Sequence, residues 1–479
     1  MKYRLLFTLP LLICLSSCSV SKQIARSARE NVLKDEALQT AHVGISIYEP
    51  ATGKYWYNYN GYKYFVPASN TKLPTCYAAM KYLGDSLVGL RYRYQDYLKT
   101  FYVIPTGDPT FLHPDFSINK VLEFYKNNID KKFEFDITNT WDEFPLGNGW
   151  SWNDFDAAYM AERSPFPIYG NIVQFKKQGE IKIFEKNSNT IITQGIKIYP
   201  KYFEKQIQGY IPYRNTYDSV KINRDFDKNL FTVRFSASKF NSTDIPFVTD
   251  GAVTYFKLLN DTIGLHWVNT LGDSPLSEEI HFSGGKATFG RGAWSKNLLL
   301  DRRDYTVIHS QPTDSLLKPM MHRSDNFFAE QSLLMVSNEL LGVMNDSKII
   351  DTLLKTDFKD LPQKPRWVDG SGLSRYNLFS PQDFVFILNK MKTDFGIDRI
   401  KNILPTGNEG TLGSRFVTDS NYIFAKTGTL SGVVALTGFL YTKKNKLLIF
   451  SVLVNNHNAS AAGVRNVVEK FIHGIREKY

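Results

Sequence analysis

Ser69 and Lys72 have the types and the spacing of a nucleophile and its base. They enclose the segment Ser69-Asn70-Thr71-Lys72, and the three residues before it, 66–68, predict a turn from a strand into a helix. Residues three apart on a helix share a face, so Lys72 can reach the Ser69 hydroxyl. A serine hydroxyl is a poor nucleophile without an adjacent base. A lysine can be that base if burial and a second cation lower its pKa toward neutrality.

The segment Ser324-Asp325-Asn326 supplies a hydroxyl and an amide for the same reaction. We expect Ser324 to relay a proton between Lys72 and the leaving amine of the substrate. Asn326 would hold an amide carbonyl of the substrate, and Asp325 would orient the loop by bonding backbone groups. The alternative is that Ser324 and Asn326 only cap a helix.

The segment Lys426-Thr427-Gly428 occurs once and falls in a strand-like run, 422–430. Lys426 is the expected second cation near Lys72. Lys426, Thr427 and Thr429, with Gly428 between the threonines, would bind a terminal carboxylate, and the strand edge would pair with a peptide backbone. The backbone N–H groups of Ser69 and Thr429 would form an oxyanion hole, an effect worth ~3–4 kcal/mol per donor.

Order and context make these motifs informative, because each alone is weak. The pattern S-x-x-K recurs elsewhere, for example at Ser236 and Lys239, and S-x-N recurs at Ser151 and Asn153. One choice of residues places a serine at a helix start, S-D-N beside a helix and K-T-G on a strand. The alternative for the first motif is a surface serine that caps a helix, with a solvated lysine.

The first residues predict a secretory leader rather than part of the fold. Lys2 and Arg4 form a basic start, and the apolar run 5–15 is too short to span a bilayer comfortably. The sequence Leu15-Ser16-Ser17-Cys18 resembles a bacterial lipobox, which implies a signal peptide over 1–17 and a lipid on Cys18. Acyl chains at ~0.8 kcal/mol per buried methylene would anchor the protein to a membrane. The alternative is an ordinary signal peptide with an incidental cysteine. Residues 18–38 are polar and predict a tether.

Composition narrows the class of protein. The chain has 479 residues and three cysteines, and only Cys76 remains if Cys14 leaves with the leader and Cys18 is lipidated. Stability must then come from core burial rather than disulfides, and the chain is too long for one ordinary domain.

The net charge is +11 without a basic run, so we expect no nucleic-acid partner. A diffuse positive surface suits an anionic wall or membrane face, or simply solvent. The eight histidines are scattered, and we expect no metal and no cofactor.

Apolar patterns outline the fold around the motifs. Runs 42–48 and 54–59 predict a hairpin, and runs 422–430, 433–441 and 447–455 predict three strands before a closing helix over 461–477. Strands from both ends of the chain therefore predict one shared sheet. The middle is rich in Tyr, Phe, Asn and Asp with short strand-like runs. We expect a catalytic domain over 39–85 plus 246–479, with a β-rich insertion over 86–245.

The chain resembles the class C low-molecular-mass penicillin-binding proteins, the D-alanyl-D-alanine carboxypeptidase/endopeptidase family of serine peptidases. Beyond the three motifs, the resemblance extends through 107–110, 324–330, 369–375, 410–412 and 450–455, and so covers nearly the whole mature chain. The family also carries a large insertion between its first and second motifs. The resemblance implies an α/β (α+β) fold of the penicillin-binding-protein/β-lactamase type, an antiparallel five-stranded sheet flanked by helices.

The resemblance also implies an activity. Family members hydrolyse the D-Ala-D-Ala bond of peptidoglycan stem peptides, or D-Ala–diamino acid cross-links, and are acylated by β-lactams. Asp154, Tyr159 and Arg375 resemble residues with which relatives recognise the diamino-acid side chain. The expected location is the bacterial cell envelope, facing the periplasm, as a membrane-anchored lipoprotein. The motifs leave the balance of the two peptidase activities and the oligomeric state open.

Two other functions use the same residues. A β-lactamase or esterase would share the nucleophile, but no E-x-x-L-N deacylating segment of the class A kind is convincing in this sequence. The second alternative is a non-catalytic lipoprotein that keeps the fold and binds the cell wall but hydrolyses nothing.

Overall fold

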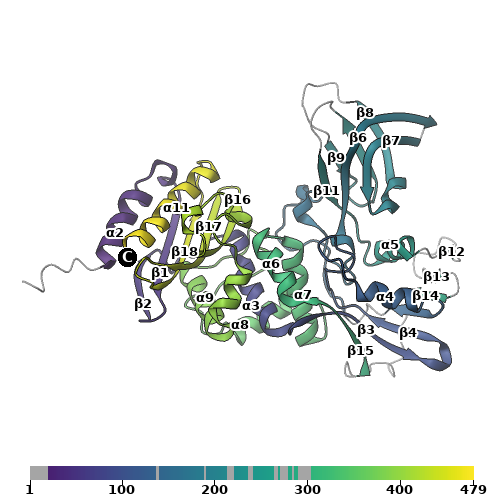
Figure 1. Cartoon of the computed structure of the whole chain (residues 1–479), viewed down its shortest axis with the longest axis horizontal. Helices are drawn as coiled ribbons and strands as arrows, with labels where there is room; N and C mark the ends of the chain where they lie inside the picture. Colours follow the sequence, from purple (N-terminus) through teal and green to yellow (C-terminus); the bar gives the residue numbers. More distant parts are fainter. Residues whose placement is uncertain are drawn as a thin grey trace, which may run out of the picture.

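The computed structural model describes residues 20–135, 140–187, 190–212, 221–235, 241–263, 268–269, 279–282, 285–289 and 304–479. The expected signal peptide and the lipidation site Cys18 lie outside these residues. Figure 1 shows two parts side by side, one built from both ends of the chain and one from its middle.

The part built from the chain ends is organised around a five-stranded sheet with strand order β16-β17-β18-β1-β2. Every neighbouring pair in it is antiparallel. Its strands are β1 (His42–Glu49), β2 (Lys54–Tyr59), β16 (Ile423–Leu430), β17 (Val433–Tyr441) and β18 (Leu447–Asn455). The predicted antiparallel five-stranded sheet, assembled from both termini, is therefore confirmed. Strand β16 lies at one edge of the sheet, where the segment around Thr406 pairs with its first residues through the bridge between Thr406 and Phe424 and the hydrogen bond from the Ala425 N–H to the Pro405 carbonyl.

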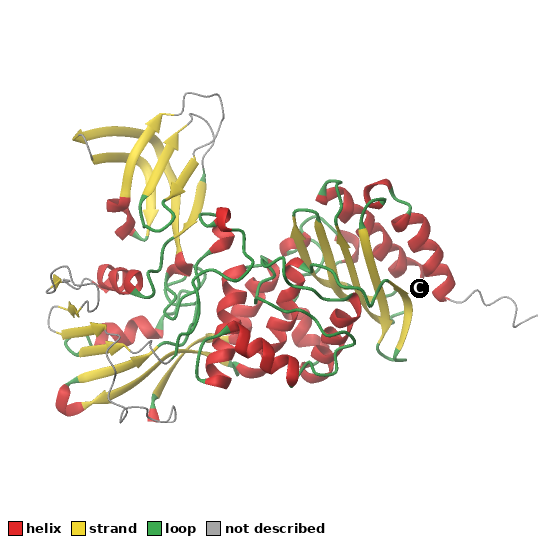
Figure 2. Ribbon diagram, turned by 180° about the vertical axis from the view of Figure 1, so that it is seen from behind, coloured by secondary structure: helices red, strands yellow, loops and turns green. Residues whose placement is uncertain are grey.

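Helices cover both faces of this sheet, as Figure 2 shows. Alternate side chains of a strand point to opposite faces, so each strand contributes to two hydrophobic clusters. On β16, Ile423 and Ala425 join α11 on one face, while Phe424 joins the helices on the other face. The helices of this part are α2 (Val20–Ala28), α3 (Lys72–Tyr82), α6 (Thr313–His322), α7 (Asn326–Leu341), α8 (Asp346–Lys355), α9 (Pro381–Phe395), α10 (Ile397–Ile403) and α11 (Ala461–Lys478).

The segment after Cys18 differs from the predicted tether. From Val20 it forms α2 and then a π-helical turn, Arg29–Leu33. Ile24, Ala28 and Val32 are buried in the cluster that α11 forms with the sheet. The tether prediction over 18–38 is therefore wrong for residues 20–38, because these few apolar residues give the polar segment one buried face.

The middle of the chain forms three further sheets with a hydrophobic cluster of their own. A seven-stranded sheet has the order β12-β13-β14-β5-β4-β3-β15, and two three-stranded sheets have the orders β8-β10-β9 and β11-β6-β7. The elements are β3 (Ser86–Gln95), β4 (Thr100–Ile104), α4 (Lys120–Asn127), β5 (Lys132–Phe135), β6 (Ile172–Asn187), β7 (Thr190–Tyr199), β8 (Ile207–Pro212), β9 (Lys221–Arg224), β10 (Phe231–Phe235), β11 (Ser242–Pro246), α5 (Val253–Ile263), β12 (Val268–Asn269), β13 (Glu279–Phe282), β14 (Gly285–Phe289) and β15 (Thr306–Pro312).

The insertion ends later in the chain than the sequence indicated. Strand β15 pairs with β3, the first strand of the insertion, and α5 packs Tyr255, Phe256 and Leu259 into the cluster of the insertion. Helix α6, from Thr313, packs Leu316 and Leu317 into the cluster of α3 and α7. The predicted return to the catalytic domain at 246 is corrected to about 313.

Candidate active site

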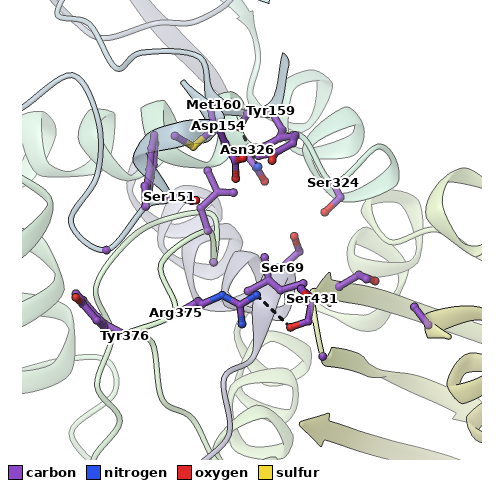
Figure 3. A pocket seen from close by; sticks show the side chains of 18 of the residues that line it. Ser69, Ser151, Asp154, Tyr159, Met160, Ser324, Asn326, Arg375, Tyr376 and Ser431 are labelled. Atoms are coloured by element: carbon purple, nitrogen blue, oxygen red, sulfur yellow. Dashed lines mark hydrogen bonds between the residues drawn. The ribbon is translucent and has the colours of Figure 1, made fainter. Parts of the chain in front are cut away.

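Ser69 lies in a short 3₁₀ turn, Ala68–Thr71, that leads directly into α3. The preceding residue, Ala68, has a φ of 48°, a left-handed conformation that costs a non-glycine residue free energy. Its carbonyl oxygen accepts a hydrogen bond from the Thr71 hydroxyl at 2.9 Å, which helps to hold the turn. The turn leaves the Ser69 side chain half-buried and directed into a cleft (Figure 3).

Lys72 is fully buried below Ser69. Its Nζ donates hydrogen bonds to Ser69 Oγ at 3.1 Å, to Asn326 Oδ1 at 2.6 Å and to the carbonyl oxygen of Ser371 at 2.8 Å. Burial lowers the pKa of Lys72 to about 8, although the carboxylates of Asp369 and Glu330 oppose this shift. The predicted pair thus has the geometry and the pKa of a nucleophile with an adjacent base.

Lys426 holds the second serine of the site. It is fully buried on β16, and its Nζ donates to Ser324 Oγ at 2.8 Å and to the carbonyl oxygen of Thr427 at 2.7 Å. Burial, with the nearby charge of Lys72, holds the pKa of Lys426 well below its usual range. Ser324 has a φ of 60°, so the backbone before α7 is in a left-handed conformation there.

The segment Ser324-Asp325-Asn326 also begins a helix. Asp325 is the N-cap of α7, and its side chain accepts a hydrogen bond from the Phe328 amide at 3.0 Å. The helix-capping role therefore belongs to Asp325. Asn326 joins the two sides of the site, because its Nδ2 donates to the carbonyl oxygen of Tyr159 at 3.0 Å while its Oδ1 faces Lys72.

Gly428 allows β16 to pass close to Ser69. A β-carbon at this position would stand 2.8 Å from the carbonyl oxygen of Pro67 and 3.1 Å from the amide nitrogen of Ser69. Such distances require a glycine. The N–H groups of Ser69 and Thr429, which we expect to form an oxyanion hole, belong to these two adjoining segments.

The loop 369–377 supplies contacts that the motifs did not reveal. Both carboxylate oxygens of Asp369 accept backbone hydrogen bonds, from Gly372 at 2.8 Å and Ser374 at 2.7 Å. Glu330 Oε1 accepts from the Ser371 amide at 2.7 Å. These bonds fix the Ser371 carbonyl that accepts from Lys72. The run 369–375 and the glutamate in 324–330 belong to the family resemblance, but no spacing rule connects them to Lys72.

A buried arginine ties the insertion to this network. Arg163 Nη1 lies 2.6 Å from Asp346 and 3.7 Å from Glu330, and Nη2 lies 2.8 Å from Glu143. One cation thus faces three buried or nearly buried carboxylates. Desolvation raises the pKa of Glu330 to about 8 and that of Glu143 to about 7.

The cleft above Ser69 has a volume of about 1060 Å³. Residues of the predicted site that line it are Ser69, Ser324, Asn326, Thr429, Asp154, Tyr159 and Arg375. Figure 3 shows Asp154, Tyr159 and Asn326 on one side of the cleft, with Ser69 and Arg375 on the other. Arg375 donates to the carbonyl oxygen of Ser431 at 3.1 Å. Thr427 does not line this cleft, and its Oγ1 donates to Thr411 Oγ1 at 2.7 Å.

Within the described part of the chain, one cluster has the spacing of metal ligands: Asp419, His473 and Glu477. Asp419 already pairs with Arg476 at 3.1 Å, and Glu477 pairs with Lys443 at 2.6 Å. None of these residues lines the cleft. The cluster is therefore accounted for as a network of ion pairs.

Comparisons with solved structures agree with this fold. The chain is similar to the crystal structure of penicillin-binding protein 4 from Haemophilus influenzae, with a TM-score of 0.66 and 19% identity over 94% of this chain and 98% of that one. A structure of the same protein with a bound β-lactam gives a TM-score of 0.63 at 18% identity, covering 95% and 99% of the two chains. The predicted penicillin-binding-protein fold is confirmed.

Sequence comparisons extend over most of the chain. It is 25% identical to a D-alanyl-D-alanine carboxypeptidase of an Actinomadura species, across 90% of this chain and 80% of the relative. It is also 25% identical to the D-alanyl-D-alanine carboxypeptidase DacB of Haemophilus influenzae, across 84% and 82% of the two chains. The model of the D-Ala-D-Ala carboxypeptidase 3 (S13) family matches residues 25–212 and 299–473, so the chain belongs to that family.

Proposed function

We propose that this protein hydrolyses D-alanyl bonds of peptidoglycan stem peptides through an acyl-enzyme on Ser69. The observation that carries the proposal is the 3.1 Å hydrogen bond between Lys72 Nζ and Ser69 Oγ, with the pKa of Lys72 lowered to about 8. A lysine with that pKa is partly neutral near neutral pH and can accept the serine proton. Membership of a D-Ala-D-Ala carboxypeptidase family supports the choice of substrate.

In the acylation step, Ser69 Oγ attacks the carbonyl carbon of the penultimate D-alanine while its proton passes to Lys72. The N–H groups of Ser69 and Thr429 would stabilise the negative charge on the carbonyl oxygen. The C–N bond then breaks, and the leaving amine takes a proton through Ser324, whose hydroxyl is held by Lys426. Water hydrolyses the ester in a second step, which restores the Ser69 hydroxyl.

The diamino-acid side chain of the stem peptide would bind between Asp154, Tyr159 and Arg375. The carboxylate of Asp154 suits an ammonium group, and the Arg375 guanidinium suits a carboxylate. Both a terminal D-Ala-D-Ala and a D-Ala–diamino acid cross-link present the same type of bond to Ser69. The proposal therefore includes carboxypeptidase and endopeptidase activity. β-Lactams would acylate Ser69 because they present a strained amide to the same nucleophile.

Membership of this carboxypeptidase family and the similarity to a bacterial D-alanyl-D-alanine carboxypeptidase support a location in the bacterial cell envelope, facing the periplasm. None of the helices in the described ranges has the length and apolar content to cross a bilayer. We propose that a lipid on Cys18 anchors the protein, with α2 starting directly after the anchor. Replacing Cys18 by alanine should then move the protein from the membrane fraction to the soluble periplasmic fraction. Unchanged membrane association would contradict the lipid anchor.

The test of the enzymatic proposal uses a soluble form that starts at Ser19, so that α2 is retained. It is incubated with a stem pentapeptide ending in D-Ala-D-Ala and, separately, with cross-linked dimeric muropeptides. Free D-alanine and muropeptide monomers are measured, with Ser69→Ala as the inactive control. Release of neither product by the unaltered protein would sink the proposal. Rapid turnover of nitrocefin without D-alanine release would identify a β-lactamase instead.

A further inference from the structure

Arg465 approaches the cleft from the C-terminal helix. It lies in the second turn of α11, one turn after Ala461, which lines the cleft together with Ser69. Its Nη2 donates a hydrogen bond to Thr429 Oγ1 at 2.6 Å. Thr429 also lines the cleft, so the Arg465 guanidinium contacts a side chain of the cleft wall.

The charge of Arg465 has no acidic partner within the described ranges of the chain. The neighbouring Arg415 differs in this respect, because it lies 2.7 Å from Glu469 and 2.8 Å from Asn466. Partial burial, with the positive charge of Arg415, lowers the pKa of Arg465. Arg465 is thus a half-buried cation that a bound anion would stabilise.

Two other cations near Ser69 bond to groups other than Thr429. Lys426 is fully buried and directs its Nζ to Ser324 and to a backbone carbonyl, so its charge does not face the cleft. Arg375 lines the cleft but bonds to the Ser431 carbonyl rather than to a threonine of β16. Arg465, by contrast, hydrogen-bonds to Thr429, the threonine of β16 that lines the cleft.

The hydrogen bond also sets the direction of the Thr429 hydroxyl. Because the Thr429 oxygen accepts from Arg465, its own O–H remains available to donate to an anion in the cleft. Carboxylates prefer several converging donors, and a guanidinium adds both charge and a second donor.

We propose that Arg465 is a specificity-determining residue that selects substrates with a free carboxylate on the residue leaving the acyl-enzyme. The inference rests on the proposed function, because it deepens the role of the same cleft. Arg465 and the Thr429 hydroxyl together bind this carboxylate. Ligands in which that group is neutral, such as an ester or a primary amide, lose the charge interaction and react more slowly.

The experiment compares Arg465→Gln with the unaltered soluble form. The second-order rate constant of acylation is measured for a penicillin as the free acid and as its methyl ester, by intact mass over time. The same comparison is made for D-alanine or D-alaninamide release from a peptide ending in the free acid or the amide. We expect the preference of the unaltered protein for the acid to fall about 10- to 100-fold in Arg465→Gln, as for loss of a charged hydrogen bond.

The matched control is Arg415→Gln, which removes the same charge from a neighbouring arginine that is already paired with Glu469. It should leave the acid-to-ester ratio within about twofold, because Glu469 already neutralises the charge of Arg415. An unchanged ratio in Arg465→Gln overturns the inference, and so does a collapse of the ratio in Arg375→Gln alone. The absence of both acylation and D-alanine release in the unaltered protein would instead defeat the proposed function.

Discussion

Lys72 and Lys426 each hold one of two serine hydroxyls in the same cleft. Lys72 Nζ lies 3.1 Å from Ser69 Oγ, and Lys426 Nζ lies 2.8 Å from Ser324 Oγ. Both lysines are fully buried, and both have a lowered pKa because desolvation disfavours the ammonium form. The site therefore contains two amines that can change protonation state during the reaction, one beside each serine.

The first prediction concerns the pH dependence of acylation. The pKa of Lys72 is lowered from 10.5 to about 8, so this lysine is mainly protonated below that pH and mainly neutral above it. Only the neutral amine can accept the Ser69 proton. The rate constant for acylation by a penicillin should rise about tenfold per pH unit below pH 8 and level off above it.

The measurement is a series of intact-mass time courses from pH 6 to pH 9.5, with the melting temperature taken at each pH to confirm that the fold is intact. A rate that is flat across this range, or that falls as the pH rises toward 8, would show that Lys72 is not the base.

A second prediction separates Ser324 from the nucleophile. Replacing Ser324 by alanine removes the hydroxyl that Lys426 holds but leaves the Ser69–Lys72 contact in place. Acylation by a penicillin should slow by about 10²- to 10⁴-fold, a usual effect of losing a proton-transfer group. The adduct should still form on Ser69 at long times. An unchanged acylation rate would reduce Ser324 to a structural role.

A third prediction tests the contact between β16 and the nucleophile. In Gly428→Ala, the new β-carbon would press on the Pro67 carbonyl and the Ser69 amide. The strand must move by a few tenths of an ångström or more, so the rate of acylation should fall by about 100-fold, as for other small displacements of reacting groups.

The control for this prediction is Gly474→Ala in α11, where no heavy atom lies within 4 Å of the added carbon. That variant should keep full activity and gain about 0.5–1 kcal/mol of stability from the better helix former. Full activity in Gly428→Ala would mean that the close approach of β16 is dispensable.

The fourth prediction concerns the buried ion pairs of Arg163, which connect the insertion to the part built from the chain ends. Arg163→Met leaves Glu143, Glu330 and Asp346 without their shared cation. Loss of one partner of a buried ion pair typically costs about 3–5 kcal/mol in the free energy of unfolding. Denaturant unfolding should show this loss, whereas Lys34→Met, which breaks an exposed pair with Glu30, should change stability very little.

The effect of Arg163→Met should also depend on pH. A carboxyl whose pKa is raised on folding binds its proton more tightly in the native state, so stability falls as pH rises from its unfolded value toward the folded one. The pKa values of Glu330 and Glu143 are already raised to about 8 and about 7, and removal of Arg163 raises them further. The destabilisation should therefore be larger at pH 8.5 than at pH 6. The opposite trend would contradict the assignment of Arg163 as the neutralising group.

The local features of the fold were predictable because each rests on a short stretch of sequence. Strands β17 and β18 coincide with their predicted runs and β16 begins one residue later than predicted, since alternating and β-branched residues specify these strands locally. The proximity of Ser69 and Lys72 follows from one helical turn. That Ser69 and Lys72 would lie near Ser324 and Lys426 was predicted from the order of the three motifs, which the chain shares with a known family.

Long-range contacts were not predictable from spacing. The Ser371 carbonyl bonds to Lys72 across 299 positions of the chain, and it does so through a backbone atom that no residue type identifies. Arg465 is one of two arginines in the amphipathic helix α11, and an arginine on such a helix usually faces solvent. Only the fold brings it to Thr429.

The later boundary of the insertion was missed for a related reason. Helix α5 has the same apolar periodicity whichever part of the molecule it packs against, so its sequence does not reveal its neighbour. The helix after Val20 was missed because the apolar residues that it buries are too few to stand out in a polar segment.

The central claim is that Ser69 is an activated nucleophile that forms a covalent acyl-enzyme. Its most direct test is intact-mass analysis of the soluble form from Ser19 after incubation with a penicillin, with Ser69→Ala alongside. The account predicts a mass increase of one penicilloyl group in the unaltered protein and none in Ser69→Ala. An adduct that persists in Ser69→Ala, or no adduct on the unaltered protein while the penicillin remains intact, would contradict it.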